Sequence, residues 1–404
     1  MGAGKSAAVA AEDLYASPNA LAPHYSRFRV SERLLLTGHS HQAWPDRALD
    51  GQRQAWLDAA DLVDDKWERA FEKADRVRRG YRRLLGEPDG PIALAASTHE
   101  LVVRFLSSLP LRDRPRVVTT DAEFHSARRQ LDRLAEEGLE VVRVPAHPAA
   151  EAGARVAAAV DDRTAAAIVS SVFYSSGHIA GGLDAAAEAC RRAGAELLVD
   201  AYHSLNVVPF SLEGLEDAWV VGGGYKYCQL GEGNCGLRIP PDRRPRPLVT
   251  GWFAEFGTKE EAAPDGKVVY ADGPSRFAGG TYDPTSHYRA AEVFDFFEDL
   301  ALAPTLLREV SRHQVGLLCE EIDALDADPA LLDRDRTVPP ERIGGFLALR
   351  SPRAAELRAG LRVRGVMTDH RDNVLRLGPA PYLSDAQLRD AIVALGEVVR
   401  ELDG

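Results

Sequence analysis

Short apolar runs alternate with longer amphipathic segments between residues 90 and 222 of the chain. Apolar runs of this length, bounded by turn residues, are typical of strands that are buried on both faces of a parallel sheet. The segments between the runs have the spacing of helices with one apolar face. The predicted strands are 92–95, 117–119, 139–144, 165–169, 197–199 and 218–221. Their strand–helix–strand order predicts right-handed crossovers and an α/β fold with a mainly parallel sheet.

Helical patterns flank this region on both sides. Residues 47–86 are expected to form helices with one shared apolar stripe, made of Trp56, Leu57, Leu62, Trp67, Phe71 and Val77. Residues 303–404 are expected to form helices and strands that end in a helix over 385–402. With 404 residues the chain is long enough for two domains. We therefore expect an N-terminal arm and active-site loop (1–46), a large domain (47–290) and a smaller α/β C-terminal domain (291–404).

Composition narrows the possible functions. The net charge of −12 argues against a nucleic-acid partner. No apolar run is long enough to span a bilayer, so no membrane role is expected. Four cysteines in a chain of this length favour a reducing, cytoplasmic location over a disulfide framework. Cys228 and Cys235 do not have a zinc spacing, and no metal site is predicted.

The chemistry is concentrated in residues 196–226. Asp200 follows one predicted strand, and Lys226 follows the next after three glycines. Open α/β sheets bind ligands at these strand ends. A carboxylate for a pyridinium nitrogen and a lysine for an aldehyde are what pyridoxal 5'-phosphate (PLP) requires, and burial can lower the pKa of such a lysine so that it moves a proton. Either residue alone would more often be a helix cap or a solvated turn residue.

The motif around these residues resembles the class V, fold-type I PLP-dependent enzymes. Within them it is most similar to kynureninase, which carries D-L-A-H-x-x-G-N and S-Y-K-Y segments. This chain has Asp-Ala-Tyr-His-Ser-Leu-Asn at 200–206 and Gly-Tyr-Lys-Tyr at 224–227, followed by Gly-Trp-Phe at 251–253. The resemblance covers about residues 39–381. It implies a fold-type I PLP-dependent transferase fold and a homodimer with shared active sites.

The resemblance also implies roles for individual residues. Lys226, Asp200 and Tyr225 would be catalytic, and His203 would orient Asp200 or the cofactor ring. The remaining cofactor contacts would be the phosphate-binding residues Ser97 and Thr98, Phe124 stacked on the ring, and Ser170, Trp252 and Thr281, with Thr281 reaching the neighbouring subunit's PLP. Ser97 or Thr98 would serve as a helix N-cap in any protein, and this geometry can bind an anion.

The substrate side of the resemblance rests on Arg376. It lies in an apolar run, where an unpartnered charge is costly, and in kynureninases the corresponding arginine grips the substrate α-carboxylate. The loop that contains His39 and Ser40 would reach the mouth of the site, where kynureninases have N-S-L-G. Ala127 stands where kynureninases have an acid, and Ala278 replaces the glutamate of an R-F-E-A-G-T segment. These departures fall mainly near the expected substrate.

The activity implied by the resemblance is kynureninase-like hydrolysis of the Cβ–Cγ bond of kynurenine or a related β-acyl alanine. The products would be alanine and a carboxylic acid. A β-eliminating lyase, such as a C–S lyase or cysteine desulfurase, and a class V aminotransferase are the alternatives among enzymes. From a different class, the chain could be a PLP-binding protein that has lost catalysis and acts as a structural or regulatory dimer.

Overall fold

A seven-stranded sheet forms the centre of the larger part of the molecule in the computed structural model, which describes residues 9–255 and 266–403. The strand order is β2-β8-β7-β6-β5-β3-β4. Strands β7, β6, β5, β3 and β4 pair in parallel, while β8 runs antiparallel to both β7 and β2. The strands are β2 (Ile92–Ala95), β3 (Arg116–Thr120), β4 (Glu140–Val144), β5 (Thr164–Ser170), β6 (Glu196–Asp200), β7 (Trp219–Gly223) and β8 (Cys235–Arg238). The prediction of a mainly parallel sheet is confirmed.

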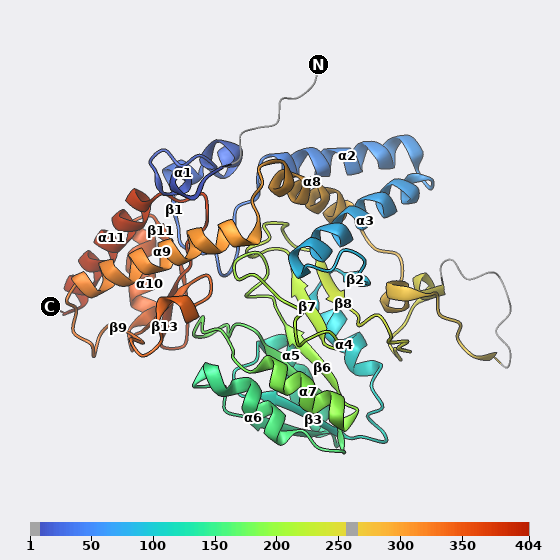
Figure 1. Ribbon diagram of the computed structural model, residues 1–404. Coiled ribbons are helices and arrows are strands. Elements are labelled where there is room, and N and C mark those ends of the chain that lie inside the picture. The colour runs from blue at the N-terminus through green and yellow to red at the C-terminus, as the bar shows by residue number, and fades with distance from the viewer. Residues whose placement is uncertain (1–8, 256–265, 404) are drawn as a thin grey trace.

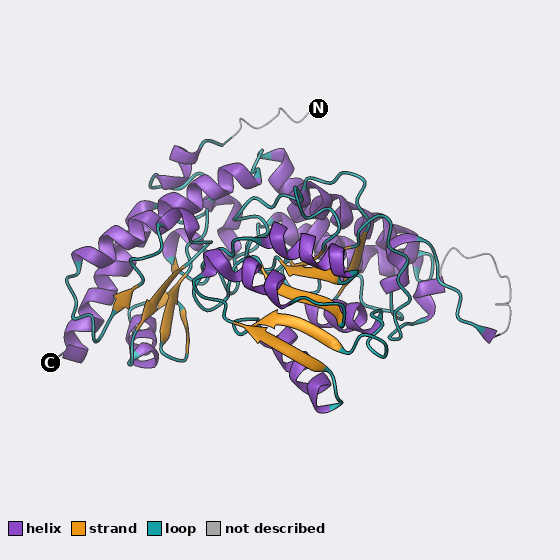
Figure 2. Ribbon diagram, turned by 60° about the horizontal axis from the view of Figure 1, so that its bottom comes forward, coloured by secondary structure: helices purple, strands orange, loops and turns teal. Residues whose placement is uncertain are grey.

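Helices cover both faces of this sheet (Figure 2). Along β5, Ala166 and Ile168 face one core, whereas Ala167 and Val169 face the other, as the alternation of a strand requires. The first core is closed by α4 (Thr98–Ser107) and α5 (His125–Glu136), and the second by α6 (Ala152–Ala159) and α7 (Leu183–Ala193). Burial on both faces explains why the strands appear in the sequence as continuous apolar runs.

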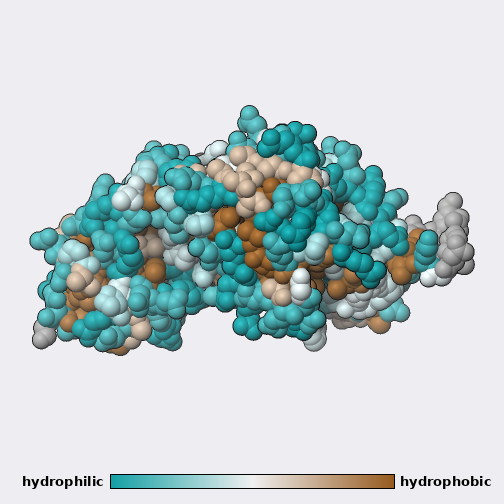
Figure 3. All heavy atoms as spheres, turned by 90° about the horizontal axis from the view of Figure 1, so that it is seen from below, coloured by the Kyte–Doolittle hydropathy of each residue, from teal (hydrophilic) through white to brown (hydrophobic). Residues whose placement is uncertain are grey.

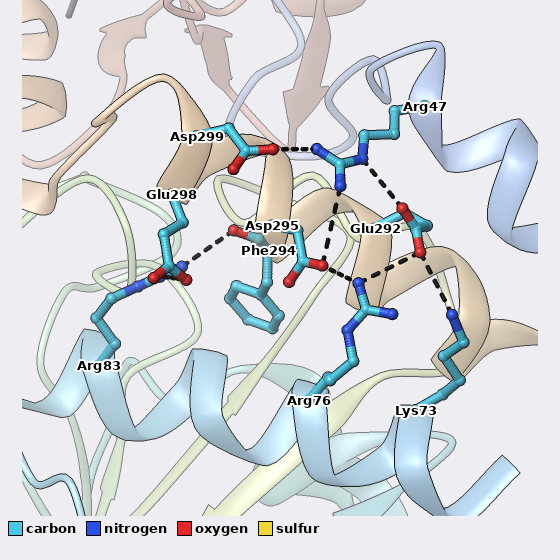
Figure 4. A network of polar contacts seen from close by, with 9 residues as sticks. All are labelled: Arg47, Lys73, Arg76, Arg83, Glu292, Phe294, Asp295, Glu298 and Asp299. Atoms are coloured by element: carbon cyan, nitrogen blue, oxygen red, sulfur yellow. Dashed lines mark hydrogen bonds and ion pairs between the residues drawn. The ribbon is translucent and has the colours of Figure 1, made fainter. Parts of the chain in front are cut away.

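Three helices from distant parts of the chain pack together beside the sheet: α2 (Arg47–Leu62), α3 (Lys66–Leu85) and α8 (Thr285–Asp299). Glycines allow the close approach, since a Cβ at Gly80 would lie 2.3 Å from the ring of Phe294. Ion pairs follow the same contact, and Glu292 of α8 accepts from Arg47 at 3.0 Å and from Lys73 at 3.4 Å (Figure 4). The boundary expected at residue 290 falls inside α8.

The predicted apolar stripe on α2 and α3 is only partly buried. Val77 is buried as expected, but Trp56 is 78% exposed and Leu57 52% exposed. The buried face of α2 consists of the small residues Ala48, Gly51 and Ala55. The stripe prediction was wrong for α2 because the helix packs closely through its small residues, which leaves its large apolar residues on the surface.

The C-terminal part contains a four-stranded antiparallel sheet with order β12-β13-β10-β9, flanked by helices. Its elements are α9 (Pro304–Ala324), β9 (Asp333–Arg334), β10 (Leu347–Arg350), α10 (Ala354–Val363), β11 (Val366–Met367), β12 (Asp369–Arg371), β13 (Val374–Leu377) and α11 (Asp385–Asp403). The N-terminal arm joins this part, because β1 (Leu34–Leu35) pairs with β11 and α1 (Ala11–Tyr15) packs on α9. The first eight residues of the expected arm lie outside the described residues.

Short 3-10 turns complete the described secondary structure: η1 (Ala22–Phe28), η2 (Val30–Glu32), η3 (Ala149–Glu151), η4 (Trp252–Glu255), η6 (Gly273–Phe277) and η7 (Pro340–Arg342). Across residues 9–255 and 266–403, we find no helix with the length and apolar character needed to cross a bilayer. The face shown in Figure 3 is polar over most of its area, with apolar side chains gathered towards its middle.

Candidate active site

The carboxyl ends of the parallel strands bring the predicted chemistry together. Asp200 ends β6 and lies in register with Ser170, the last residue of β5. Phe124 lies beyond the end of β3 and occupies the N-cap position of α5. Lys226 follows β7 after a short turn. Residues that are far apart in the sequence therefore meet at one edge of the sheet, which is where ligands bind in open α/β folds.

Lys226 is buried at the centre of this group. Its Nζ lies 2.7 Å from His203 Nε2, 5.3 Å from the ring centre of Phe124 and 4.8 Å from that of Tyr202. Burial lowers the pKa of Lys226 to about 7, against the opposing effect of the Asp200 carboxylate. Burial also holds the pKa of His203 well below its usual value, so the group within hydrogen-bond distance of the amine is a neutral imidazole. Near neutral pH a substantial fraction of Lys226 is therefore the nucleophilic free amine.

Asp200 is half-buried at the end of β6, with one hydrogen bond to its carboxylate among the described residues. Its Oδ1 accepts from the Tyr202 backbone N–H at 2.9 Å. Burial raises the pKa of Asp200, against this hydrogen bond and the charge of Lys226. A buried carboxylate is costly unless it has a charged partner. A protonated pyridine nitrogen would supply that partner, so the residues present fit PLP.

Glu123 is a buried carboxylate beside this group that sequence reasoning missed. It accepts hydrogen bonds from the Ser170 amide at 3.1 Å and the Ser170 hydroxyl at 2.5 Å, and from Thr120 Oγ1 at 2.6 Å. Burial raises the pKa of Glu123 to about 7, against these hydrogen bonds, and Asp200 raises it further. Because the Ser170 hydroxyl donates to Glu123, a cofactor contact by Ser170 would have to use its oxygen as an acceptor.

The N-terminus of α4 has the anion-binding features predicted from the sequence. Ser97 is the N-cap, and its Oγ accepts from the Glu100 amide at 3.3 Å. Thr98 begins the helix, and its amide interacts with the Cys235 thiol. Free amides and the helix dipole make such an end suitable for a phosphate group. A phosphate contact by Ser97 or Thr98 stays a prediction.

Arg376 is buried in β13 and is already engaged by protein groups. Its guanidinium donates to both carboxylate oxygens of Asp369, with a distance of 2.9 Å from Nε to Oδ1, and Nη1 donates to the Tyr174 carbonyl at 2.7 Å. His39 Nε2 lies 2.7 Å from the same Oδ1. Three of the five N–H groups of Arg376 are thus used, and two remain for a ligand carboxylate.

His39 therefore contacts Asp369 rather than an open mouth of the site. Burial lowers the pKa of His39 to about 4 although the Asp369 carboxylate opposes this, so His39 is neutral and donates from Nε2. Burial alone would raise the pKa of Asp369, but the bonds from His39 and Arg376 outweigh it and hold the pKa well below its usual range. Asp369 could have been found from the sequence, because a turn at 372–373 places it opposite Arg376 in a hairpin.

We expect Asp369→Asn to weaken substrate binding with little effect on turnover. An amide keeps the shape of the side chain but loses the negative charge that holds the Arg376 guanidinium in position. Charge-assisted hydrogen bonds are about twice as strong as neutral ones. The KM for an amino-acid substrate should rise by about tenfold, and kcat should change by less than about threefold. Asp333→Asn, which removes a carboxylate from an exposed pair with Arg350, is the matched control. A lower kcat with unchanged KM would contradict this role.

The remaining predicted site residues lie at three places in the structure. Tyr225 stacks on His41 at 4.7 Å between ring centres, and Ser40 lies within 3.2 Å of the same histidine ring. Thr281 lines a cleft of about 850 Å³ together with Ala96, and neither Lys226 nor Asp200 lines that cleft. Trp252, in η4, packs on Phe253 and is 56% exposed. Contacts of Trp252 and Thr281 with a cofactor stay predictions. Within the described chain, no cluster of His, Cys, Asp and Glu could hold a metal ion.

Sequence comparisons give distant relatives. No family model matches the chain. An uncharacterized aminotransferase of Bacillus subtilis, YcbU, is 25% identical over 343 residues, which cover 84% of this chain and 87% of that protein. A kynureninase of Burkholderia mallei is 28% identical over 258 residues, which cover 60% of this chain and 58% of the kynureninase. The chain thus matches less than two thirds of the kynureninase's length.

Solved structures establish the fold. A C-DES mutant with glycine covalently linked to its PLP cofactor superimposes with a TM-score of 0.81 and 14% identity, covering 93% of this chain and 98% of that one. An apo cysteine desulfurase from Thermococcus onnurineus gives a TM-score of 0.76 with 16% identity, covering 92% and 95%. The chain has the fold-type I architecture of the class V PLP-dependent enzymes, as predicted.

Proposed function

We propose that this protein is a PLP-dependent enzyme that acts on an α-amino acid. One observation carries the proposal: Lys226, with a pKa lowered to about 7, contacts His203 beyond one strand end, and the half-buried Asp200 carboxylate lies at the end of the next strand. The C-DES structure, with its PLP cofactor, has the same overall fold. PLP is the cofactor, and it supplies an electron-withdrawing ring that makes the Cα–H bond of a bound amino acid acidic.

The roles of the protein residues follow from their positions. Lys226 would hold the cofactor covalently and move the proton at Cα, and His203, within hydrogen-bond distance of Nζ, would orient it. Asp200 would pair with the ring nitrogen, and Phe124 would cover the ring. Arg376 binds the substrate α-carboxylate with the N–H groups that Asp369 leaves unused.

Within this class we propose kynureninase-like hydrolysis of a Cβ–Cγ bond. Water adds to the γ-carbonyl carbon of kynurenine or a related β-acyl alanine, and the Cβ–Cγ bond breaks to give alanine and a carboxylic acid. The D-x-x-H and Y-K-Y segments and the similarity to the Burkholderia kynureninase support this reaction.

β-Elimination or transamination is the alternative. The relative that covers most of the chain carries the name aminotransferase, and one neighbour with a TM-score of 0.78 is titled a cystine C–S lyase. Desulfuration is disfavoured by the thiols, because all four cysteines are buried and burial raises the pKa of Cys190 and Cys235 to about 12. A thiol with such a pKa is a poor nucleophile near pH 7.

A product assay separates these reactions. Purified, PLP-loaded protein is incubated with L-kynurenine and with 3-hydroxykynurenine, and alanine and the aromatic acid are measured. Equal amounts of alanine and an anthranilate support the hydrolase. Pyruvate or sulfide released from other amino acids would indicate a β-eliminating lyase instead of the hydrolase. A keto acid formed only when an amino acceptor is present would indicate an aminotransferase. If the protein binds PLP but converts none of the amino acids, it would be a PLP-binding protein that has lost catalysis.

We also propose that the protein forms a homodimer that shares its active sites. The α2–α3 hairpin carries the large exposed apolar residues Trp56, Leu57, Leu62 and Val63, and Leu248 is 86% exposed. Large exposed apolar residues can mark a protein interface. A second copy is the occupant proposed here, because Thr281 is the residue expected to reach a neighbouring subunit's cofactor.

Replacement of both Trp56 and Leu57 by glutamate is expected to shift the protein from dimer to monomer. Burying two unpaired carboxylates in the interface would cost more free energy than the remaining contacts of the dimer contribute. Light scattering coupled to size-exclusion chromatography measures the mass. Val393→Glu, at an exposed position on α11, is the control and should leave the mass unchanged. A wild-type protein that is monomeric at all concentrations would contradict the dimer.

A further inference from the structure

Tyr202 occupies an unusual position next to the lysine. The kynureninase segment D-L-A-H has alanine at this place, whereas this chain has tyrosine two residues after Asp200. The side chain is buried, with 7% exposure. Its ring centre lies 4.8 Å from Lys226 Nζ and 5.1 Å from the ring centre of Tyr225.

The Tyr202 hydroxyl is buried, and no described group stands in hydrogen-bond geometry to it. Almost all buried polar groups in folded proteins have a partner, and an unpaired hydroxyl needs an explanation such as an absent ligand. The neighbouring Tyr225 side chain is close enough to raise the pKa of Tyr202 further, after the larger effect of burial and that of Cys235. The Tyr225 hydroxyl and the Cys235 thiol thus lie close to the Tyr202 hydroxyl, but neither stands in hydrogen-bond geometry to it.

The ring of Tyr202 is fixed in direction by its surroundings. It occupies the space beside Gly223, where an added Cβ would lie 2.5 Å from the hydroxyl oxygen and 2.2 Å from the ring. The hydroxyl lies near the Cys235 thiol, and that thiol lies near the amide of Thr98 at the start of α4. Tyr202 therefore extends from the amine of Lys226 towards the N-terminus of α4.

At the two glycines next to Gly223, an added Cβ would also collide with a side chain of the protein. A Cβ at Gly222 would lie 2.4 Å from Leu205, and one at Gly224 would lie 2.7 Å from Leu230. The three glycines before Tyr225 therefore make room for the protein's own side chains. At Gly223 it is the Tyr202 ring that takes the space.

We propose that Tyr202 is a cofactor-binding residue, and that its hydroxyl donates a hydrogen bond to the phosphate of PLP. This inference rests on the proposed PLP-dependent function. A cofactor attached to Lys226 has its reactive end beside the Tyr202 ring, and the anion-binding end of α4 is close to the Tyr202 hydroxyl. The phosphate supplies the acceptor that this buried hydroxyl lacks, and the helix dipole favours an anion at the same point.

The test compares PLP with pyridoxal, which lacks the phosphate, in cofactor-free wild-type protein and in Tyr202→Phe. Binding is measured by absorbance titration and by equilibrium dialysis. We expect Tyr202→Phe to weaken PLP binding by about tenfold or more, since the lost hydrogen bond is to a charged group. Pyridoxal binding should change by less than about twofold. Ser311→Ala, which also removes a buried unpaired hydroxyl but lies in α9, is the matched control and should leave PLP affinity unchanged.

The melting temperature of the cofactor-free protein separates a cofactor-binding role of Tyr202 from a structural role, because loss of a structural contact would lower it. Without cofactor, Tyr202→Phe should melt at the same or a higher temperature than wild type, because the variant loses only an unpaired buried hydroxyl. A lower melting temperature, or equal losses of PLP and pyridoxal affinity, would overturn the phosphate role. Unchanged PLP affinity would overturn it too. If wild type binds neither compound, the proposed function itself fails.

Discussion

Lys226→Ala is expected to abolish covalent capture of PLP and to lower amino-acid turnover by about a thousandfold or more. In the proposed function the lysine amine is the nucleophile for the cofactor aldehyde and the base at Cα, and a positioned acid–base group alone contributes about 10²–10⁴ in rate. Burial and the charge of Arg376 keep the Lys226 pKa low enough for both tasks at neutral pH, against the effect of Asp200. Alanine can perform neither task.

Absorbance spectra and product assays measure this loss. The variant should still fold, because removal of a buried amine with a depressed pKa leaves mainly a small apolar gap. Lys66→Ala, at the start of α3, is the control and should retain the spectrum and the activity. A Lys226→Ala protein that still binds PLP covalently, or that keeps more than about a tenth of the turnover, would place the reactive lysine elsewhere.

Asp200→Asn is expected to lower turnover by about 10²–10³ with a smaller effect on folding. An amide has the shape of the carboxylate but cannot hold a positive charge on a ring nitrogen, and loss of one preorganised electrostatic partner typically costs this much. The wild-type carboxylate has one described hydrogen bond, from the Tyr202 amide, which an amide oxygen can still accept. The change therefore removes charge and keeps geometry.

The matching control is Asp217→Asn, an exposed acid on the loop between β6 and β7. Turnover and the position of the cofactor absorbance band are measured for both variants. Unchanged turnover in Asp200→Asn would contradict its pairing with the cofactor. Asp200→Asn should also relieve the cost of the buried carboxylate in the cofactor-free protein, so its melting temperature without PLP should not fall.

The sequence predicted the central sheet well because its strands are buried on both faces. Such strands are continuous apolar runs, and β5 and β6 appear at nearly the expected residues. The direction of β8 was not predictable in this way, since an apolar strand has the same pattern whether it runs parallel or antiparallel. The α2 stripe failed for the opposite reason: its apolar residues face outward, and periodicity does not show which face of a helix packs on its neighbours.

The candidate site was predictable where a residue type and a strand end coincide. Asp200, His203 and Lys226 meet as expected, and Phe124 lies beside them. The residues that were missed act through other side chains. Asp369 holds Arg376 across a hairpin, and the pair could be found in the sequence only by recognising the turn at 372–373 that sets the register.

Tyr202 and Glu123 were missed for a related reason. Both are next to predicted site residues in the sequence, but their importance comes from burial and from which polar partners they have or lack. A buried unpaired hydroxyl and a buried carboxylate with raised pKa can be recognised only when the three-dimensional surroundings are known.

The most direct test of the account is to locate the covalent attachment of PLP. Protein incubated with PLP across a range of pH is reduced with borohydride and digested, and the labelled peptide is identified by mass spectrometry. We predict label on Lys226, with a yield that rises with pH around 7, because the reactive form is the neutral amine and its pKa is about 7. Label on another lysine, or no specific label at any pH, would contradict the account.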